Sequence, residues 1–287
     1  MEAGLLRIGE LSRRTGVSPE LLRAWERRYG LLHPVRSEGG LRLYRPGDLE
    51  RVLRMQQHLA DGLAAAEAAV LVAESETASE GLAFDAVRAR SDLGSALEAF
   101  DESAAQAILD SVISATTLDT MLSEIVIPYL HELGSAWERG EVSVAQEHFA
   151  TAVLRGRLLG LARGWGRGYG PRALLACLPG EQHDLGLIAF GLALRSRNFR
   201  IAYLGGDMPI ESVAGAADVV EPAAIVLSTA IPGRFRTFRD ELKELASRHR
   251  TYIGGAGADE AEAEAIGATF LSGGPVEEAE RLAEVGG

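Results

Sequence analysis

Cysteine is nearly absent from this chain, which has one in 287 residues. A single cysteine excludes an internal disulfide and any metal site built from several cysteines. Long apolar runs are also missing, and none approaches the roughly 20 residues that a membrane helix needs. The N-terminus lacks the basic region and apolar stretch that are typical of a secretory signal. These absences favour an intracellular, cytoplasmic protein with no membrane partner.

Lysine is scarce as well, because only Lys243 among the 29 basic residues is a lysine. Arginine suits planar, bidentate partners such as phosphate, although a GC-rich genome produces the same bias. The net charge of −12 argues, taken whole, against nucleic acid. The charge is unevenly spread, however: residues 1–60 hold 11 arginines against seven acidic residues, which leaves −16 for the remainder. The sequence therefore predicts a basic N-terminal module on an acidic body.

The length suits about two domains of roughly 100–200 residues, but the sequence pattern changes more often than that. Residues 5–60 are predicted to form short helical segments, within an N-terminal domain placed at residues 1–75. The Ala/Glu-rich residues 61–80 are typical of a helix end and a linker. Residues 82–164 have the 3.6-residue periodicity of a helical bundle. The glycine-rich residues 164–171 indicate a second linker.

Residues 171–287 alternate short apolar runs with helical stretches, which is typical of βαβ units and a parallel sheet. The predicted strands are Arg172–Leu178, Arg200–Leu204, Ala223–Ser228, Thr251–Gly254 and Ala268–Leu271. We therefore predict a multidomain α and α/β protein. Its parts are a winged helix-turn-helix, a four-helix bundle and a flavodoxin-like or Rossmann-like domain.

The N-terminal module begins with a predicted helix over Ile8–Arg14, followed by a tight turn. Ser18 then caps a second helix, with Pro19 at its first position. This arrangement is typical of a helix-turn-helix. Two short extended runs carry Arg36 and Arg42 around a predicted hairpin turn at residues 38–40, and these runs form the wing.

The segments Ile8–Leu11, Leu22–Leu31 and Gly40–Tyr44 resemble the DNA-binding domain of the MerR family. The resemblance implies that the second helix enters a major groove while wing arginines reach phosphates. The expected DNA contacts are Arg14, Ser18, Arg23, Arg27, Tyr29, Arg36, Arg42 and Tyr44. Many MerR proteins continue into a long dimerising helix; this chain does not, so its dimer contacts must lie elsewhere.

A histidine follows the first predicted strand of the sheet domain. His183 lies between that strand and the apolar helix predicted at Leu187–Arg195, at the strand edge where ligands bind in open α/β sheets. Glu181 can hold the second ring nitrogen and so select the tautomer, and Gly186 permits close packing. A lone histidine is more often structural, so an unliganded flavodoxin-like domain is the alternative.

Ser228 and Gly254-Gly255 end two later strands, and with the histidine loop they resemble the cobalamin-binding domain of corrinoid proteins. The resemblance implies that His183 is the lower ligand of cobalt, that Ser228 bonds the displaced nucleotide tail, and that the glycines leave a groove for that tail. Family members usually have Asp at the place of Glu181. The expected cofactor residues in this domain are Glu181, His183, Asp184, Gly186, Ser228, Thr229, Gly254 and Gly255.

The helical block brings an aromatic residue near a Glu-His pair. Gly140 ends one predicted helix and Ser143 caps the next, so Trp137, Glu147 and His148 converge across the corner. The simpler interpretation is a core tryptophan with a surface Glu and His.

The Trp and Glu-His spacing and the order of the three modules resemble the CarH/LitR-type photoreceptor repressors, which use adenosylcobalamin. The resemblance implies a non-enzymatic repressor that binds operator DNA. It also implies a homo-oligomer, a dark tetramer that light takes apart. Trp137, Glu147 and His148 would contact the adenosyl group.

One position departs from that family. Glu138 follows the tryptophan, where the family has the histidine that binds cobalt after light. The nearest other histidines are His131, expected to point away from the Trp137 side, and His148. Three alternatives remain: a light-independent cobalamin sensor, a photosensor that binds cobalamin and a second tetrapyrrole (a bilin), and a corrinoid methyl carrier. The basic winged helix argues against the carrier.

Overall fold

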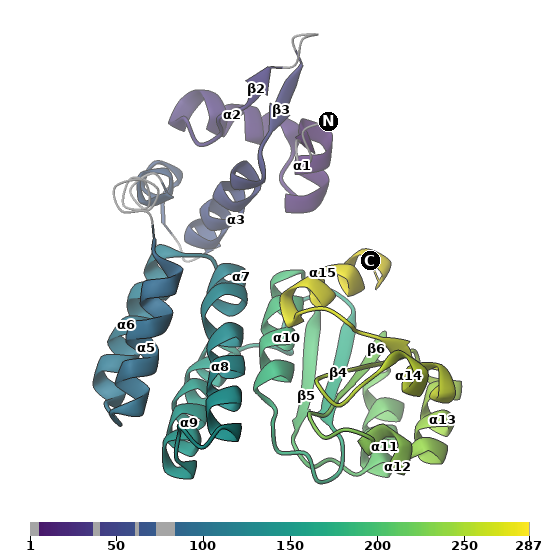
Figure 1. The fold of residues 1–287 in the computed structure, drawn as a ribbon. Coiled ribbons are helices and arrows are strands. Elements are labelled where there is room, and N and C mark those ends of the chain that lie inside the picture. The colour runs from purple at the N-terminus through teal and green to yellow at the C-terminus, as the bar shows by residue number, and fades with distance from the viewer. Residues whose placement is uncertain (1–5, 37–40, 61–62, 73–83, 287) are drawn as a thin grey trace. The chain divides into compact units, whose positions relative to one another are not determined.

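The computed structural model describes residues 6–36, 41–60, 63–72 and 84–286. The chain divides into two compact units, residues 1–84 and residues 85–287, which are described separately (Figure 1). No helix in the described ranges is long and apolar enough to cross a membrane.

The N-terminal unit is a winged helix-turn-helix. Its elements in chain order are β1 (Leu6–Arg7), α1 (Ile8–Thr15), α2 (Pro19–Tyr29), β2 (Val35–Arg36), β3 (Arg42–Tyr44), α3 (Pro46–Ala60) and a helix over 65–72. The Ser18 hydroxyl accepts a hydrogen bond from the Leu21 amide, so the predicted N-cap is confirmed. β2 and β3 pair antiparallel with Arg36 opposite Arg42. The turn predicted at residues 38–40 lies outside the described residues.

The core of this unit corrects part of the prediction for residues 61–80, which was a helix end followed by a linker. Ala68, Ala69 and Val72 are buried and belong to the same cluster as Leu22 and Trp25. Their spacing puts three small apolar side chains on one face of a helix, which is enough to dock it. Part of the stretch predicted as a linker is therefore a packed helix.

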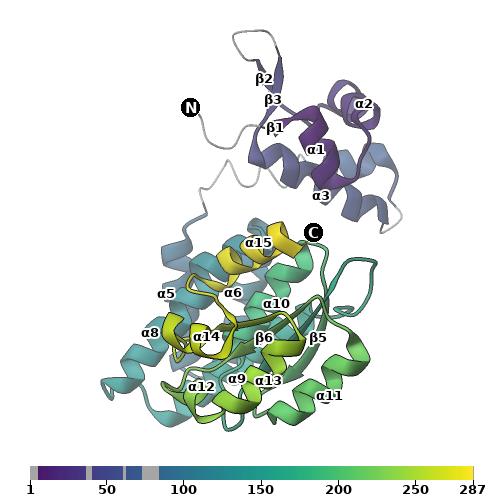
Figure 2. The same ribbon diagram turned by 90° about the vertical axis from the view of Figure 1, so that its right-hand side faces the viewer.

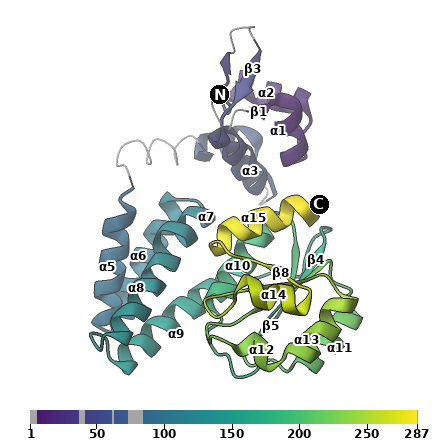
Figure 3. The same cartoon turned by 45° about the vertical axis from the view of Figure 1, so that its right-hand side comes forward.

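The second unit begins with the predicted helical bundle (Figure 3). It consists of α5 (Ala86–Glu98), α6 (Glu102–Ala115), α7 (Leu118–Thr120), a π-helical turn η1 (Met121–Val126), α8 (Ile127–Glu138) and α9 (Val144–Leu161). Ser143 and Gln146 form a reciprocal capping box at the start of α9, as its sequence signature suggests. The π-helical turn was not predicted from the sequence.

The sheet domain has five parallel strands in the order β5-β4-β6-β7-β8. The strands are β4 (Arg172–Cys177), β5 (Arg200–Gly205), β6 (Ala224–Ser228), β7 (Thr251–Gly254) and β8 (Thr269–Phe270). The helices are α10 (Leu185–Ser196), α11 (Ile210–Val220), α12 (Arg234–Thr237), α13 (Arg239–Arg248), α14 (Glu260–Ile266) and α15 (Pro275–Gly286). Every predicted strand is present within about a residue of its bounds, so the doubly wound fold is confirmed.

Alternate residues of each strand pack on opposite faces of this sheet. Leu174 and Ala176 of β4 join Ile225 and Leu227 of β6 in a core with α11, α13 and α14. Helices α10 and α15 pack against each other on the opposite face (Figure 2). The chain passes from β4 to β5 on one side, and the connection from β5 through α11 then crosses to β6 on the other side of β4. The ends of β4 and β6 therefore form the topological switch point, where such folds bind ligands.

The stretch predicted as a linker at 164–171 is packed against the sheet. Trp165 is 8% exposed, its carbonyl accepts a hydrogen bond of 2.9 Å from the Ile201 amide, and its ring meets the edge of Tyr203. Gly191 of α10 makes room for it, since a Cβ there would lie 3.1 Å from the Trp165 ring. Within the stretch itself, a Cβ at Gly170 would lie 1.6 Å from the Asn198 carbonyl oxygen. Glycine there therefore serves close packing, in the segment that joins bundle and sheet in one unit.

Candidate functional site

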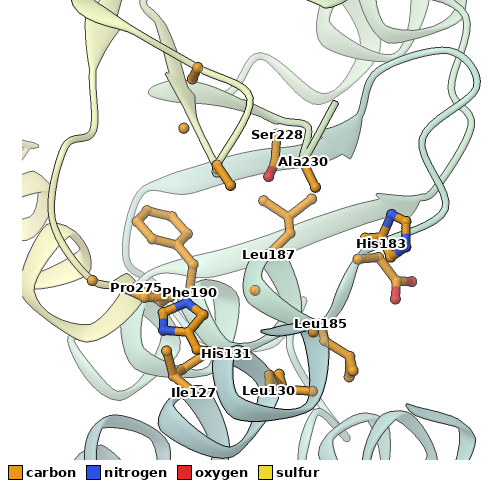
Figure 4. Close-up of a pocket in the computed structure, with 18 of the residues that line it drawn as sticks. Ile127, Leu130, His131, His183, Leu185, Leu187, Phe190, Ser228, Ala230 and Pro275 are labelled. Carbon is orange, nitrogen blue, oxygen red and sulfur yellow. The ribbon is translucent and has the colours of Figure 1, made fainter. Parts of the chain in front are cut away.

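A cavity of about 880 Å³ lies between the bundle and the carboxyl edge of the sheet (Figure 4). Helix α8 and the first turns of α9 form one wall, and the strand ends with their following loops form the other. This volume is near the upper end of the usual range of ligand sites, roughly 300–1,000 Å³. It suits a large ligand that spans both parts of the unit.

His183 lines this cavity from the loop between β4 and α10, as predicted (Figure 4). Its side chain is 70% exposed. The ring nitrogen Nδ1 lies 2.6 Å from Glu181 Oε1, and the same oxygen accepts the His183 amide at 2.7 Å. A carboxylate at Nδ1 selects the tautomer whose Nε2 is free to bind a metal. The predicted pairing of Glu181 with His183 is thus present.

Glu181 is fully buried, so it does not line the cavity and acts through its neighbours. Its other oxygen, Oε2, accepts hydrogen bonds from the Thr229 hydroxyl at 2.8 Å and the Ala230 amide at 2.6 Å. Burial raises the pKa of the Glu181 carboxyl, but the hydrogen bonds from His183, Thr229 and Ala230 outweigh it, and the pKa is lowered overall. The side chain is therefore an ionised anchor for the histidine loop.

Thr229 is also fully buried, which corrects the expectation that it contacts the ligand. Its hydroxyl is occupied by Glu181 and by the Ile231 amide. The residue stabilises the anchor and lies outside the cavity wall.

The strand ends supply a cavity wall with little side-chain bulk. Ser228, Gly254 and Gly255 at the ends of β6 and β7 line the cavity, and so does Gly186 in the first turn of α10. All four were predicted to contact the ligand. Gly255 has a φ of +93°, and a Cβ there would lie 2.5 Å from the Thr229 carbonyl. Both the backbone conformation and the close approach to β6 therefore require glycine at this position.

The three residues predicted on the bundle, Trp137, Glu147 and His148, all line the same cavity. Trp137 is half exposed, which excludes the alternative of a core tryptophan. Glu147 accepts a hydrogen bond of 2.9 Å from the Thr151 hydroxyl, and its other oxygen lies 3.4 Å from His148 Nε2. An aromatic face and a polar pair are thus presented to one ligand.

His131 lines the cavity as well, although it was expected to point away from the Trp137 side (Figure 4). The expectation treated the site as a narrow stripe of α8, whereas the cavity extends along that helix from Ile127 to Trp137. Glu138 is exposed and is not among the described residues that line it. His131 and His148 of the bundle therefore face the site, and Glu138 does not.

Asp184 is buried beside His183 and lines the cavity, and two residues missed by sequence reasoning hold it. Arg155 of α9 donates from Nε and Nη2 to both carboxylate oxygens at 2.8–3.0 Å, and the Tyr203 hydroxyl donates at 2.5 Å. Both partners are distant in sequence. The only signal in the sequence was a carboxylate next to an apolar helix, which requires a partner.

The structure supports only some of the residues predicted to contact DNA in the N-terminal unit. Arg23 and Arg27 of α2 are exposed, as a recognition helix requires. Tyr44, expected at the DNA, is fully buried, and its hydroxyl donates to Glu26 at 3.0 Å. The hydrophobic ring completes the core, so Tyr44 is a structural residue.

The remaining predicted DNA residues have local partners. Arg42 pairs with Glu26 at 3.0 Å, Arg14 pairs with Glu10 at 2.8 Å, and Ser18 is the N-cap of α2. Tyr29 is half buried, with the Arg28 guanidinium 5.7 Å from its ring centre. The side chain of Arg36 lies outside the described residues. Arg23 and Arg27 are therefore the least encumbered of the predicted contacts.

Three family models match the chain, in the order predicted for the modules. Residues 6–75 match the MerR HTH family regulatory protein, and residues 89–159 and 171–283 match two models described as B12 binding domain. The second unit also resembles the monomethylamine corrinoid protein of Methanosarcina barkeri, with a TM-score of 0.56 at 18% identity over 67% of this chain and 96% of that one. That likeness establishes the fold.

Two curated proteins of Myxococcus xanthus match nearly the whole chain. The HTH-type transcriptional repressor CarH is 33% identical, covering 88% of this chain and 89% of its own length. The HTH-type transcriptional repressor CarA is 32% identical, covering 89% and 88%. The regulator MlrA of Escherichia coli is 37% identical over 68 residues, which are 24% of this chain.

The fold and the matches define a class: a transcriptional regulator that joins a MerR-type DNA-binding unit to a B12-binding domain. Within that class, the chain belongs to the CarH/CarA family of HTH-type transcriptional repressors.

The anchoring role of Glu181 predicts the effect of Glu181→Gln. The amide group would face the donors of Thr229 and Ala230 or of His183, which leaves a buried clash and costs about 1–3 kcal/mol at pH 7. Because the folded pKa lies below the usual 4.5, the carboxylate's contribution is full above that pH and is lost as the pH falls through the lower folded value.

Urea unfolding followed by circular dichroism at several pH values measures both effects. We expect the free energy of unfolding to fall on acidification less steeply in Glu181→Gln than in the wild type. The control is Glu244→Gln on the exposed face of α13. Equal stability of the two variants at pH 7 would contradict the anchor.

Proposed function

We propose that this protein is a light-responsive repressor that binds adenosylcobalamin in the cavity and holds operator DNA as an oligomer. The observation that carries the proposal is His183, oriented by Glu181 at the switch point of the sheet, facing a bundle wall with Trp137 in a chain that also has a DNA-binding unit. In this proposal the chain has three functional modules, residues 1–75, 82–164 and 171–287, a cytoplasmic location and no enzymatic activity.

The residues present fit a cobalt corrinoid. Imidazole is a suitable axial ligand, and the carboxylate on its other nitrogen raises its basicity. Gly254 and Gly255 line the cavity without side-chain bulk, together with Ser228, whose hydroxyl would bond a nucleotide tail there. When bound, adenosylcobalamin would supply a cobalt–carbon bond that light can break.

The chain's own residues would convert that event into a change of assembly. Trp137, Glu147 and His148 would contact the adenosyl group, and their contacts would stabilise one docking geometry of the bundle. A ligand shifts an equilibrium only through contacts that differ between the two states. Loss of the adenosyl group would therefore remove the preference for the geometry that forms the oligomer.

The lower-ligand assignment predicts that His183→Ala remains folded but binds cobalamin at least about tenfold more weakly, because the protein's axial bond is lost. The measurement is equilibrium dialysis with adenosylcobalamin in darkness, together with the visible spectrum. His33→Ala is the matched control, since that exposed histidine lies in the N-terminal unit. Equally tight binding by His183→Ala, with the same spectrum, would exclude His183 as the ligand.

The light response is tested by measuring, by light scattering, the molar mass of the protein loaded with adenosylcobalamin, first in darkness and then after green light. We expect a larger mass in darkness and weaker operator binding after illumination. The control is the same protein loaded with methylcobalamin and kept dark, which separates ligand choice from light.

Unchanged mass and operator affinity after light would support the alternative of a light-independent cobalamin sensor, which the exposed Glu138 favours. An additional absorption band in the purified protein that cobalamin does not explain would indicate a bilin. In the main proposal, the candidates to replace the family histidine that binds cobalt after light are His131 and His148, which line the bundle side of the cavity.

DNA binding is tested on α2. If Arg23 contacts one phosphate, Arg23→Gln weakens operator binding and makes the negative slope of log K against log salt shallower by about 0.9. The same change at Arg42 also weakens binding, by less, because Glu26 already holds its guanidinium.

Arg88→Gln is the matched control, an exposed arginine on α5 of the acidic body. The measurement is operator affinity by fluorescence anisotropy across a salt series. A slope for Arg23→Gln equal to that of the control would place Arg23 away from the DNA backbone.

A further inference from the structure

The loop that carries His183 is anchored at two ends by different parts of the molecule. Glu181, before the histidine, is held by Thr229 and Ala230 at the end of β6, within the sheet domain. Asp184, after the histidine, is held by Arg155, which belongs to bundle helix α9. The charged partner of the second anchor is therefore supplied by the bundle, whereas the other donor to Asp184, Tyr203, belongs to β5 of the sheet.

The Asp184 carboxylate needs this arginine. Its side chain is 4% exposed, and a buried carboxylate is costly unless it is paired and hydrogen-bonded. The guanidinium fork reaches both oxygens, and the hydrogen bond to Asp184 raises the pKa of Arg155. Tyr203 adds a neutral donor, and its own pKa is raised by burial and by Asp184. In the described residues, the ion pair of Asp184 is made with Arg155, from the bundle.

Arg155 also lies in line with the residues of α9 that face the cavity. His148, Thr151 and Arg155 follow at positions i, i+3 and i+7, which share one face of a helix. His148 and Thr151 line the cavity, and Arg155 reaches Asp184 about two turns further along. A displacement of this helix face therefore moves the ligand-contacting residues and the Asp184 partner together.

We propose that Arg155 is a positioning residue that couples the bundle to the His183 loop, so that the docking of α9 controls how His183 meets the ligand. This inference rests on the proposed function, because it concerns ligation of a corrinoid by His183. By thermodynamic linkage, a contact between the upper face of the ligand and α9 that changes the docking of α9 also changes the affinity of His183 for cobalt. Binding of cobalt by His183 changes the docking equilibrium of α9 by the same free energy.

A double-mutant cycle separates this role from simple structural support. Arg155→Met retains an unbranched stem and removes the fork. We expect it to weaken binding of adenosylcobalamin in darkness by about tenfold, as other outer-shell changes at metal ligands do. Combined with His183→Ala it should add little, because a residue that acts through another loses its effect when that other is removed.

Two variants serve as controls. Arg157→Met makes the same change two residues away, at an arginine whose partner, Asp110, lies within the bundle. Arg155→Lys restores the charge and one donor, so it should recover part of the affinity. Additive effects of Arg155→Met and His183→Ala, or an equal loss in Arg157→Met, would overturn the coupling.

Hydrogen exchange of the protein without ligand tests the same interaction independently of cobalamin. Arg155→Met should speed exchange of the amides from His183 to Ile188 by about tenfold, whereas Arg157→Met should not. Unchanged exchange in this segment overturns the proposal. If the wild type takes up no cobalamin, the proposed function fails, and faster exchange in Arg155→Met alone still supports the coupling of α9 to the loop.

Discussion

The cofactor site depends on one constraint, the burial of an ionised carboxylate at Glu181. A charge without exposed surface is stable only when donors surround it. Here the donors come from His183 on the loop itself and from Thr229 and Ala230 at the end of β6. The hydrogen bonds to the Glu181 carboxylate therefore close the loop onto the neighbouring strand, and this closure holds His183 at the switch point of the sheet.

Sequence reasoning predicted features that are local in the chain. The N-cap at Ser18, the five strands and the pairing of Glu181 with His183 involve residues within a few positions of one another, and the structure contains all of them. It missed Arg155, because the ion pair with Asp184 joins positions 29 residues apart and depends on how a helix docks. It misplaced Tyr44 for a related reason, since a tyrosine beside a wing suits either DNA or the core.

The glycine-rich stretch at 164–171 shows how composition can mislead. Glycine permits a flexible chain, but it also permits close approach, and composition does not distinguish the two. Trp165 decides the matter, because a large apolar ring in a short connection gains more from burial than from exposure. Burial also explains residues 68–72, where small apolar side chains at helical spacing dock a helix in a region rich in alanine and glutamate.

Helix α9 connects the two faces of the site. Its capping box starts the helix at the corner beside Trp137. Its first turns present Glu147 and His148 to the cavity. About two turns after His148, Arg155 forms an ion pair with Asp184. A continuous helix of this kind moves as one body, because a sharp kink would break backbone hydrogen bonds. A rearrangement at the bundle wall therefore reaches the residue beside His183 without passing through the core of the sheet. The two anchors of the histidine loop then differ in kind: the partners of Glu181 belong to the sheet domain, whereas Asp184 has one neutral partner in the sheet, Tyr203, and its charged partner, Arg155, in the bundle.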